Sequence, residues 1–208
     1  MNFLVKICGI TRPEDAAQAV AAGADLIGLN FWRGSKRFVP DDQAREIIAA
    51  IPKGVLRVGV FVNAHPLVVS ETVEELKLDR VQLHGGEIPT TWNWLRPEQI
   101  IRTIRARDQA SLKEALGWEA SLFLYDAYAE GYGGSGKRAP WEVVAEGARR
   151  PFLIAGGLNP SNVTQAIEAT SPDGVDVSSG VESAPGIKDT RKLRAFIKSA
   201  RAAAARLK

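Results

Sequence analysis

The sequence contains little cysteine and little histidine. One cysteine, Cys8, and two histidines, His65 and His84, occur in 208 residues. A single cysteine excludes an intrachain disulfide, and these three residues are too few to supply the four Cys and His ligands of a structural zinc site. We therefore expect no metal.

The sequence also lacks a long hydrophobic run. No stretch approaches the roughly 18 apolar residues that a membrane-spanning helix requires. The segment from Met1 to Lys6 does not have the basic residues and apolar core of a secretory signal. We expect a cytoplasmic protein without a membrane partner.

An excess of one charge is absent from most of the chain. The formal net charge is +3, but the segment from Arg191 to Lys208 holds seven basic and no acidic residues, so the rest is net negative. Apart from Phe196, no aromatic side chain lies among these basic residues. An exposed helix face explains the basic segment, and we expect no nucleic-acid partner.

Short apolar runs rich in β-branched residues recur along the whole chain. They begin 20 to 31 residues apart, and helix-forming segments such as Pro13–Ala22 and Asp41–Ile51 separate them. The expected strands are Val5–Ile10, Leu26–Phe31, Arg57–Val62, Arg80–His84, Ile100–Ala106, Leu122–Ala127, Phe152–Gly157 and Gly174–Ser179.

Alternating strands and helices predict an α/β protein with a parallel sheet covered by helices. A doubly wound sheet has the same alternation, but eight units of about 26 residues favour a single (β/α)8 TIM barrel domain over residues 1–208. Two helix starts support this division. Thr11 to Glu14 has the pattern of a capping box, and Asn159-Pro160 that of an N-cap followed by proline.

Active sites of such barrels lie where strands end, and Cys8 ends the first expected strand. A buried free cysteine usually acts as a small hydrophobe. However, Lys6 lies on the same face of the strand, and a cation beside the thiol favours the thiolate. Cys8 is therefore a candidate catalytic residue.

Three more polar residues lie at or near strand ends. Asp126 shares a face with Leu122 and Leu124, so it is either a buried carboxylic acid suited to general acid catalysis or a loop anchor. His84 ends the fourth strand, and Asp176 lies in the eighth. Each is either a substrate-binding residue or a framework residue.

Three glycine and serine clusters follow consecutive strands. Backbone N–H groups of such loops often bind a phosphate group in barrels. Tight turns alone would also explain the glycines, but three clusters after consecutive strands favour phosphate binding. The candidate phosphate-binding residues are Gly133, Gly134, Ser135, Gly136, Gly156, Gly157, Ser178, Ser179 and Gly180. The segment Gly131–Lys137 matches a P-loop in its glycines and lysine. A P-loop is excluded because Arg138 replaces the hydroxyl residue that binds magnesium.

Arg37 lies in a long basic and aromatic loop after the second strand. Its guanidinium is suited to pairing with a substrate carboxylate, while a solvated loop explains the same residues without a ligand.

The chain resembles the phosphoribosylanthranilate isomerase family over nearly its whole length. The segments that carry the resemblance are Val5–Thr11, Gly23–Asp25, Phe31–Val39, Val58–Val62, Val81–Gly85, Asp126–Ala127, Gly133–Lys137, Ala155–Leu158 and Gly174–Glu182.

This resemblance implies an Amadori rearrangement in tryptophan biosynthesis, without a metal or cofactor. The family's general acid corresponds to Asp126 and its general base to Cys8. The resemblance also implies that Arg37 pairs with the anthranilate carboxylate and that the glycine and serine loops bind the phosphate.

Three other functions remain open. The histidine-pathway isomerase performs the same rearrangement on a two-phosphate substrate, but its chemistry is associated with an aspartate where this chain has Cys8, and we find no second phosphate site. A non-catalytic phosphosugar-binding barrel needs neither Cys8 nor Asp126. A flavin-binding barrel shares the phosphate loops, and a colourless purified protein excludes it.

Overall fold

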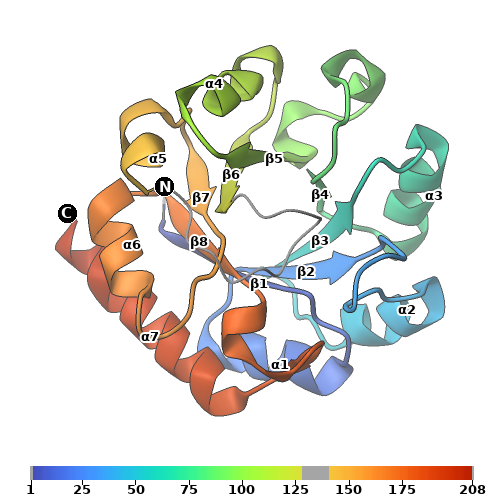
Figure 1. Cartoon of the computed structure of the whole chain (residues 1–208). Coiled ribbons are helices and arrows are strands. Elements are labelled where there is room, and N and C mark those ends of the chain that lie inside the picture. Colours follow the sequence, from blue (N-terminus) through green and yellow to red (C-terminus); the bar gives the residue numbers. More distant parts are fainter. Residues whose placement is uncertain (1, 128–140, 208) are drawn as a thin grey trace.

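Eight parallel strands form a closed barrel (Figure 1). The structure is a computed structural model that describes residues 2–127 and 141–207. The strands follow one another around the ring, and β1 pairs with β8 to close it. They are β1 Leu4–Cys8, β2 Leu26–Asn30, β3 Leu56–Phe61, β4 Arg80–Leu83, β5 Ile100–Ala106, β6 Leu122–Ala127, β7 Phe152–Ile154 and β8 Gly174–Val177. The predicted TIM barrel is confirmed.

Helices surround the barrel as an outer layer (Figure 1). They are α1 Pro13–Ala22, α2 Asp41–Ala49, α3 Pro66–Leu76, α4 Gln109–Leu112, α5 Trp141–Gly147, α6 Val163–Thr170 and α7 Thr190–Arg206. Apolar side chains fill the space between the strands and the helices. In the part of the chain that the structure describes, no helix has the length and apolarity to cross a membrane.

The connection between β4 and β5 departs from the predicted alternation of strand and helix. Across residues 84–99, all of them described, it forms only the 3₁₀-helices η1 Pro89–Trp92 and η2 Pro97–Gln99. Proline lacks the N–H group that a helix interior needs, so Pro97 prevents one continuous helix from forming here. Trp92 and Trp118 are buried beside this part of the barrel, the latter just after the 3₁₀-helix η3 Lys113–Gly117.

Two predicted helix starts have different outcomes. The capping box at Thr11 is wrong, because its hydroxyl donates to the carbonyl oxygen of Gly186 and α1 has no side-chain cap. Asn159 does cap a turn, since its side chain accepts a hydrogen bond from the N–H of Ser161 at 2.9 Å. The α-helix itself begins later, at Val163.

Inside the barrel, polar side chains lie at the carboxyl ends of the strands, and an apolar layer lies beneath them. Side chains of alternate strand residues form the apolar layer, namely Leu26, Val58, Ile101, Leu122, Leu124, Leu153 and Ala155. Lys6 and Asp176 lie inside the same barrel and form an ion pair between β1 and β8. The strand ends above this layer therefore carry the polar groups.

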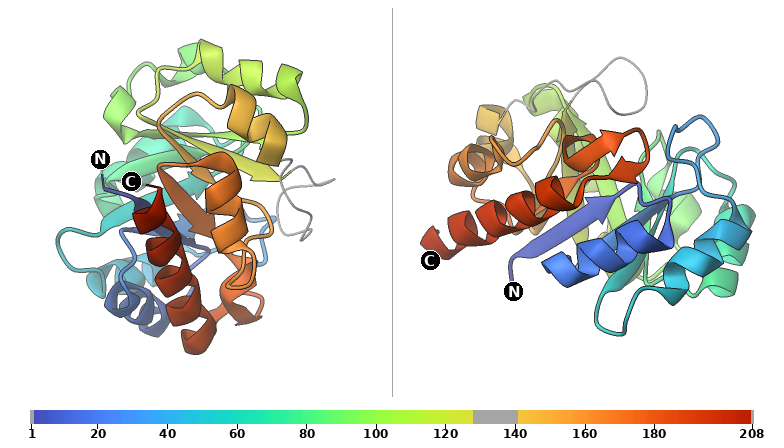
Figure 2. Two further views of the ribbon diagram at one scale, coloured as in Figure 1. Left: turned by 90° about the vertical axis from the view of Figure 1, so that its left-hand side faces the viewer. Right: turned by 90° about the horizontal axis from the view of Figure 1, so that it is seen from below.

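A small hairpin follows the barrel. After the 3₁₀-helix η4 Ser179–Val181, β9 Glu182–Ala184 pairs antiparallel with β10 Ile187–Lys188, and α7 begins two residues later. Both described ends of the chain lie on the same side of the barrel (Figure 2).

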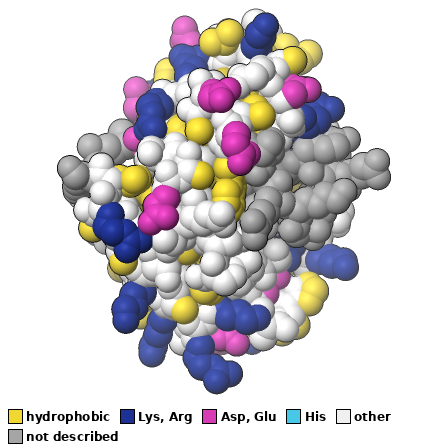
Figure 3. Space-filling view, turned by 60° about the vertical axis from the view of Figure 1, so that its left-hand side comes forward, with side chains coloured by type: hydrophobic (Ala, Val, Ile, Leu, Met, Phe, Trp, Pro, Cys, Tyr) yellow, Lys and Arg dark blue, Asp and Glu magenta, His cyan; other side chains and the backbone are white. Residues whose placement is uncertain are grey.

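The long terminal helix α7 is amphipathic, as the sequence predicts. Its apolar face is buried, including Leu193 and Phe196. Arg201 pairs with Asp25, and Arg206 pairs with Glu168. Lys and Arg side chains predominate on the lower part of the face in Figure 3, where α7 lies. The basic excess is thus the exposed side of one helix.

We expect Gly174→Ala to destabilise the barrel at the β1–β8 seam. A Cβ at this position would collide with the carbonyl oxygen of Leu4 and lie 2.6 Å from a methyl group of Leu153. The free energy of unfolding, measured with urea, should fall by about 1–3 kcal/mol, as for other overpacked sites. The matched control is Gly117→Ala, where the nearest atom would be 3.7 Å away. Equal stability of the two variants would contradict this account.

Candidate active site

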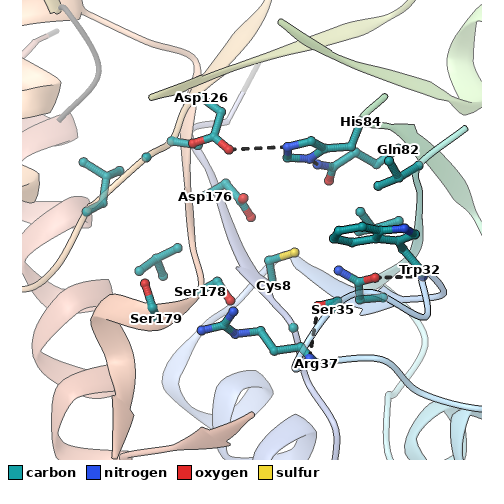
Figure 4. A pocket seen from close by; sticks show the side chains of 18 of the residues that line it. Cys8, Trp32, Ser35, Arg37, Gln82, His84, Asp126, Asp176, Ser178 and Ser179 are labelled. Carbon is teal, nitrogen blue, oxygen red and sulfur yellow. Dashed lines mark hydrogen bonds and ion pairs between the residues drawn. The ribbon is translucent and has the colours of Figure 1, made fainter. Parts of the chain in front are cut away.

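A cavity of about 130 Å³ opens at the carboxyl ends of the strands (Figure 4). Every strand except β5 contributes to it, directly or through the loop that follows. The lining residues are Cys8, Gly9, Asn30, Trp32, Ser35, Arg37, Val60, Val62, Gln82, His84, Asp126, Ala155, Gly156, Gly157, Leu158, Asp176, Val177, Ser178 and Ser179. The five predicted catalytic and substrate-binding residues, Cys8, Arg37, His84, Asp126 and Asp176, are therefore brought together.

Cys8 points into the barrel together with Lys6, as the alternation of the strand predicts. A Cβ on the neighbouring Gly28 would be only 2.9 Å from the Cys8 Sγ and 3.1 Å from the Lys6 Nζ. Burial raises the pKa of the Cys8 thiol, and the positive charge of Lys6 offsets this only in part. Lys6 thus favours the thiolate, as expected, but burial has the larger effect and leaves the pKa of Cys8 raised.

Lys6 is engaged by Asp176. The Lys6 Nζ donates to Asp176 Oδ1 at 2.8 Å, and the lysine side chain is fully buried. Burial lowers the pKa of Lys6, but the carboxylate of Asp176 and the neighbouring Cys8 outweigh burial and leave it raised. The ammonium is therefore charged and fixes the Asp176 side chain at the cavity.

His84 faces Asp126 across the top of the cavity, with 3.5 Å between Nε2 and Oδ2 (Figure 4). Burial, followed by the positive charges of Arg105, Lys6 and Arg102, lowers the pKa of His84 to about 3. The imidazole is therefore neutral.

Gln82 sets the orientation of the His84 ring. Its amide nitrogen lies 3.1 Å from Nδ1 of His84 and donates to the Thr103 hydroxyl at 3.1 Å. When Gln82 donates to Nδ1, the proton of the neutral ring is on Nε2. His84 then directs an N–H group toward Asp126.

The loops after β7 and β8 form another wall of the cavity. Gly156 and Gly157 have φ values of 86° and 67°, which explains why glycine is required there. A Cβ on Gly180 would collide with the carbonyl oxygen of Leu158. Gly156 and Gly157 line the cavity, whereas Gly180 does not.

The serine residues strengthen the case for a ligand at this wall. Ser178 and Ser179 line the cavity, and the buried Ser178 hydroxyl has no hydrogen-bond partner among the described residues. The other predicted phosphate-binding residues, Gly133, Gly134, Ser135 and Gly136, lie outside the described residues.

Arg37 lines the cavity but directs two N–H groups away from it. Its Nε and Nη2 donate to the two carboxylate oxygens of Glu182, each at 2.7 Å. This pairing outweighs burial and raises the pKa of Arg37. Nε and Nη2 of Arg37 are therefore occupied by Glu182, and Nη1 is the guanidinium nitrogen that does not contact this carboxylate.

Sequence reasoning missed several residues of the cavity and its support. Trp32 and Asn30 line it, and Glu182 holds Arg37. Asn30 ends β2, so its position at a strand end is a usable signal. Glu182 had no such signal, because its importance depends on a hairpin of short strands.

Over residues 2–127 and 141–207, no cluster of His, Cys, Asp and Glu side chains could hold a metal ion. The chemistry available in the described cavity consists of a thiol, two carboxyl groups, a neutral imidazole and a guanidinium.

Comparisons with known proteins agree on one family. A family model described as N-(5'phosphoribosyl)anthranilate (PRA) isomerase matches residues 5–199. A relative from Geobacter metallireducens, named N-(5'-phosphoribosyl)anthranilate isomerase, is 45% identical over 200 residues, which cover 95% of this chain and 98% of the relative.

Solved structures give the same result. The crystal structure of phosphoribosyl anthranilate isomerase from Thermotoga maritima has a TM-score of 0.86 and 38% identity, and covers 97% of this chain and 100% of its own. Another isomerase structure, in complex with reduced 1-(o-carboxyphenylamino)-1-deoxyribulose 5-phosphate, has a TM-score of 0.83 and 36% identity, with coverage of 97% and 100%.

We expect His84 to remain neutral between about pH 7 and pH 5, where an ordinary histidine gains a proton. Its pKa of about 3 lies below the ordinary value of 6.5, so the stability it contributes is present above pH 6.5 and lost as the pH falls toward 3. NMR titration of the imidazole signals measures this directly. His84→Asn assigns the signal by removing it, and a midpoint near 6.5 would contradict the proposed neutral state.

Proposed function

The chain belongs to the N-(5'-phosphoribosyl)anthranilate isomerase family, and on this premise we propose that Cys8 is its general base and Asp126 its general acid. The protein is an enzyme of tryptophan biosynthesis. It converts N-(5'-phosphoribosyl)anthranilate into 1-(2-carboxyphenylamino)-1-deoxyribulose 5-phosphate. The observation that carries the assignment is that Cys8 and Asp126, from β1 and β6, line one cavity.

Asp126 begins the reaction as an acid. Its proton passes to the ring oxygen of the ribose, the C1–O bond breaks, and the lone pair of the anthranilate nitrogen forms a Schiff base. The N–H group of neutral His84 faces the carboxylate that remains. His84 thereby stabilises Asp126 after proton transfer and is a positioning residue.

Cys8 continues the reaction as a base. The positively charged Schiff base makes the proton on C2 acidic, and the Cys8 thiolate removes it to leave a neutral enolamine. Burial raises the pKa of this thiol. The positive charge of the Schiff base opposes that effect, so the thiolate is favoured when it is needed. The enolamine then tautomerises to the ketone.

The two ends of the substrate are held on different walls. Gly156, Gly157, Ser178 and Ser179 are suited to the phosphate, because backbone N–H groups and hydroxyls donate to its oxygens. Gly180 shapes the same loop, and a contribution from Gly133, Gly134, Ser135 and Gly136 remains a prediction.

The anthranilate end is assigned to the wall around Arg37 and Trp32. The Nη1 group of Arg37 is available for the substrate carboxylate, and Trp32 provides an aromatic surface at the same cavity. Asp176, held by Lys6, is assigned to the sugar between the two ends. Fixing both ends brings C2 to Cys8 and the ring oxygen to Asp126.

The alternative functions are less well supported. A histidine-pathway substrate carries a second phosphate, and the cavity of about 130 Å³ has one phosphate-type wall among the described residues. A non-catalytic binding barrel requires neither the thiol nor the carboxyl group. A single domain over residues 1–208, a cytoplasmic location and the absence of a cofactor remain predictions.

We expect Cys8→Ala and Asp126→Asn each to lower kcat by about 10²–10⁴-fold, the usual contribution of a general acid or base. Turnover of phosphoribosylanthranilate is measured with a chelator present, and binding of the reduced product analogue is measured separately. Both variants should still bind the analogue, because its phosphate contacts are unchanged.

The control is Thr91→Ala, which removes an exposed hydroxyl that does not line the cavity. Its kcat should stay close to that of the wild type. A wild-type protein that binds the analogue but does not turn over substrate would favour the phosphosugar-binding barrel. Equal loss of binding and kcat would make the altered residue structural.

A further inference from the structure

We propose that Lys188, which does not line the cavity, is a positioning residue that holds the general base, the phosphate loop and Arg37 in one arrangement. The proposal rests on the function assigned above to Cys8. Lys188 lies on β10, in the hairpin that follows the barrel.

Lys188 makes three contacts with its ammonium group. The Nζ atom donates to the carbonyl oxygen of Cys8 at 2.7 Å, to that of Ser178 at 3.1 Å, and to Glu182 Oε1 at 2.8 Å. Its side chain is fully buried. An ammonium has three N–H donors, so each of them has a partner.

These contacts reach two catalytic segments at once. Cys8 ends β1, and Ser178 follows β8 directly. One buried charge therefore ties the backbone that carries the thiol to the backbone that carries the phosphate-binding hydroxyl. The strand pairing of β1 and β8 includes neither Cys8 nor Ser178, so Lys188 adds a link above the point where the ladder ends.

Glu182 extends this link to the third segment. Its Oε1 accepts from both Lys188 and Arg37, and its Oε2 accepts from Arg37 alone. The carboxylate is buried, with 5% of its side chain exposed. Burial raises the pKa of Glu182, but Arg37 and Lys188 outweigh it and leave the pKa lowered. The carboxylate therefore stays charged and holds Arg37 and Lys188, although burial outweighs Glu182 at Lys188 and leaves the pKa of that lysine lowered.

Hydrogen bonds to the rest of the protein hold the hairpin in place, and they therefore fix the backbone of Lys188. The backbone N–H of Lys188 donates to the buried Asp15 at 3.0 Å. Thr11 donates to the carbonyl oxygen of Gly186, and the Lys192 ammonium donates to that of Glu182 at 2.7 Å.

The same residues set the charge near the thiol. Lys6, Lys188 and Arg37 bring positive charge to this region, and Asp176 and Glu182 bring negative charge. The positive charge of Lys188 lowers the pKa of Cys8, against the larger effect of burial. Removal of Lys188 is therefore expected to raise the pKa of the Cys8 thiol as well as to displace Cys8, Ser178 and Arg37.

The test uses the rate of alkylation by iodoacetamide as a function of pH, without substrate. Cys8 is the one cysteine of the sequence, so the midpoint reports its thiol alone. Lys188→Met should raise the midpoint, because the positive charge of Lys188 lowers the pKa of Cys8, and Glu182→Gln should shift it in the opposite direction, because it removes a negative charge. The double variant should return toward the wild-type value.

The matched control is Lys198→Met, which removes an exposed lysine of α7 that lies outside the hairpin. It should leave the midpoint and kcat unchanged. Lys188→Met should lower kcat by about tenfold or more, because small displacements of reacting groups are costly. Lys188→Arg, which keeps the charge, should recover part of this loss.

Shifts in the same direction for Lys188→Met and Glu182→Gln would overturn the proposal, as would equal effects of Lys188→Met and Lys198→Met. If Lys188→Met does not fold, the downward shift of the midpoint in Glu182→Gln, compared with Lys198→Met, decides the question. Failure of the catalytic assignment is distinguishable, because Cys8→Ala would then retain turnover while the alkylation midpoints still shift.

Discussion

The ion pair between Lys6 and Asp176 is the interaction on which the rest of this structure depends. It joins β1 to β8, where the barrel closes, and it lies directly beneath the cavity. Neither charge is tolerable alone in such a place, since removing one partner of a buried pair typically costs about 3–5 kcal/mol. The pair also fixes the side chain of Asp176 and brings a positive charge close to Cys8. The same ion pair therefore contributes to closing the barrel and to the charge around Cys8.

The polar layer above this pair is divided into groups of different charge state. Burial keeps His84 neutral on one wall, whereas carboxylate partners keep Lys6 and Arg37 charged. Each state follows from the partner that the fold supplies. A neutral donor faces Asp126, the proposed general acid. Permanent charges hold backbone and side chains that must stay in place.

Much of this arrangement could be predicted from the sequence, because it depends on periodicity. Alternation along β1 and β6 correctly placed Cys8 and Asp126 inside the barrel. The pKa of Cys8 could not be predicted, since it depends on how far burial outweighs Lys6. The pairing of Arg37 with Glu182 joins residues 145 positions apart, and nothing local indicates it. The predicted helix after β4 is wrong, because the connection contains two prolines and a buried tryptophan and forms only short 3₁₀-helices.

Cys8 and Ser178 lie on the two sides of the seam between β1 and β8, and this has a consequence for partial unfolding. When β1 separates from β8, Cys8 moves away from the loop that carries Ser178, even if the other strands stay paired. On the proposed assignment of Cys8, molecules in which β1 and β8 have separated have no activity. A turnover measurement then reports only molecules with a closed barrel. Selection for activity would therefore also select for stable pairing of β1 with β8.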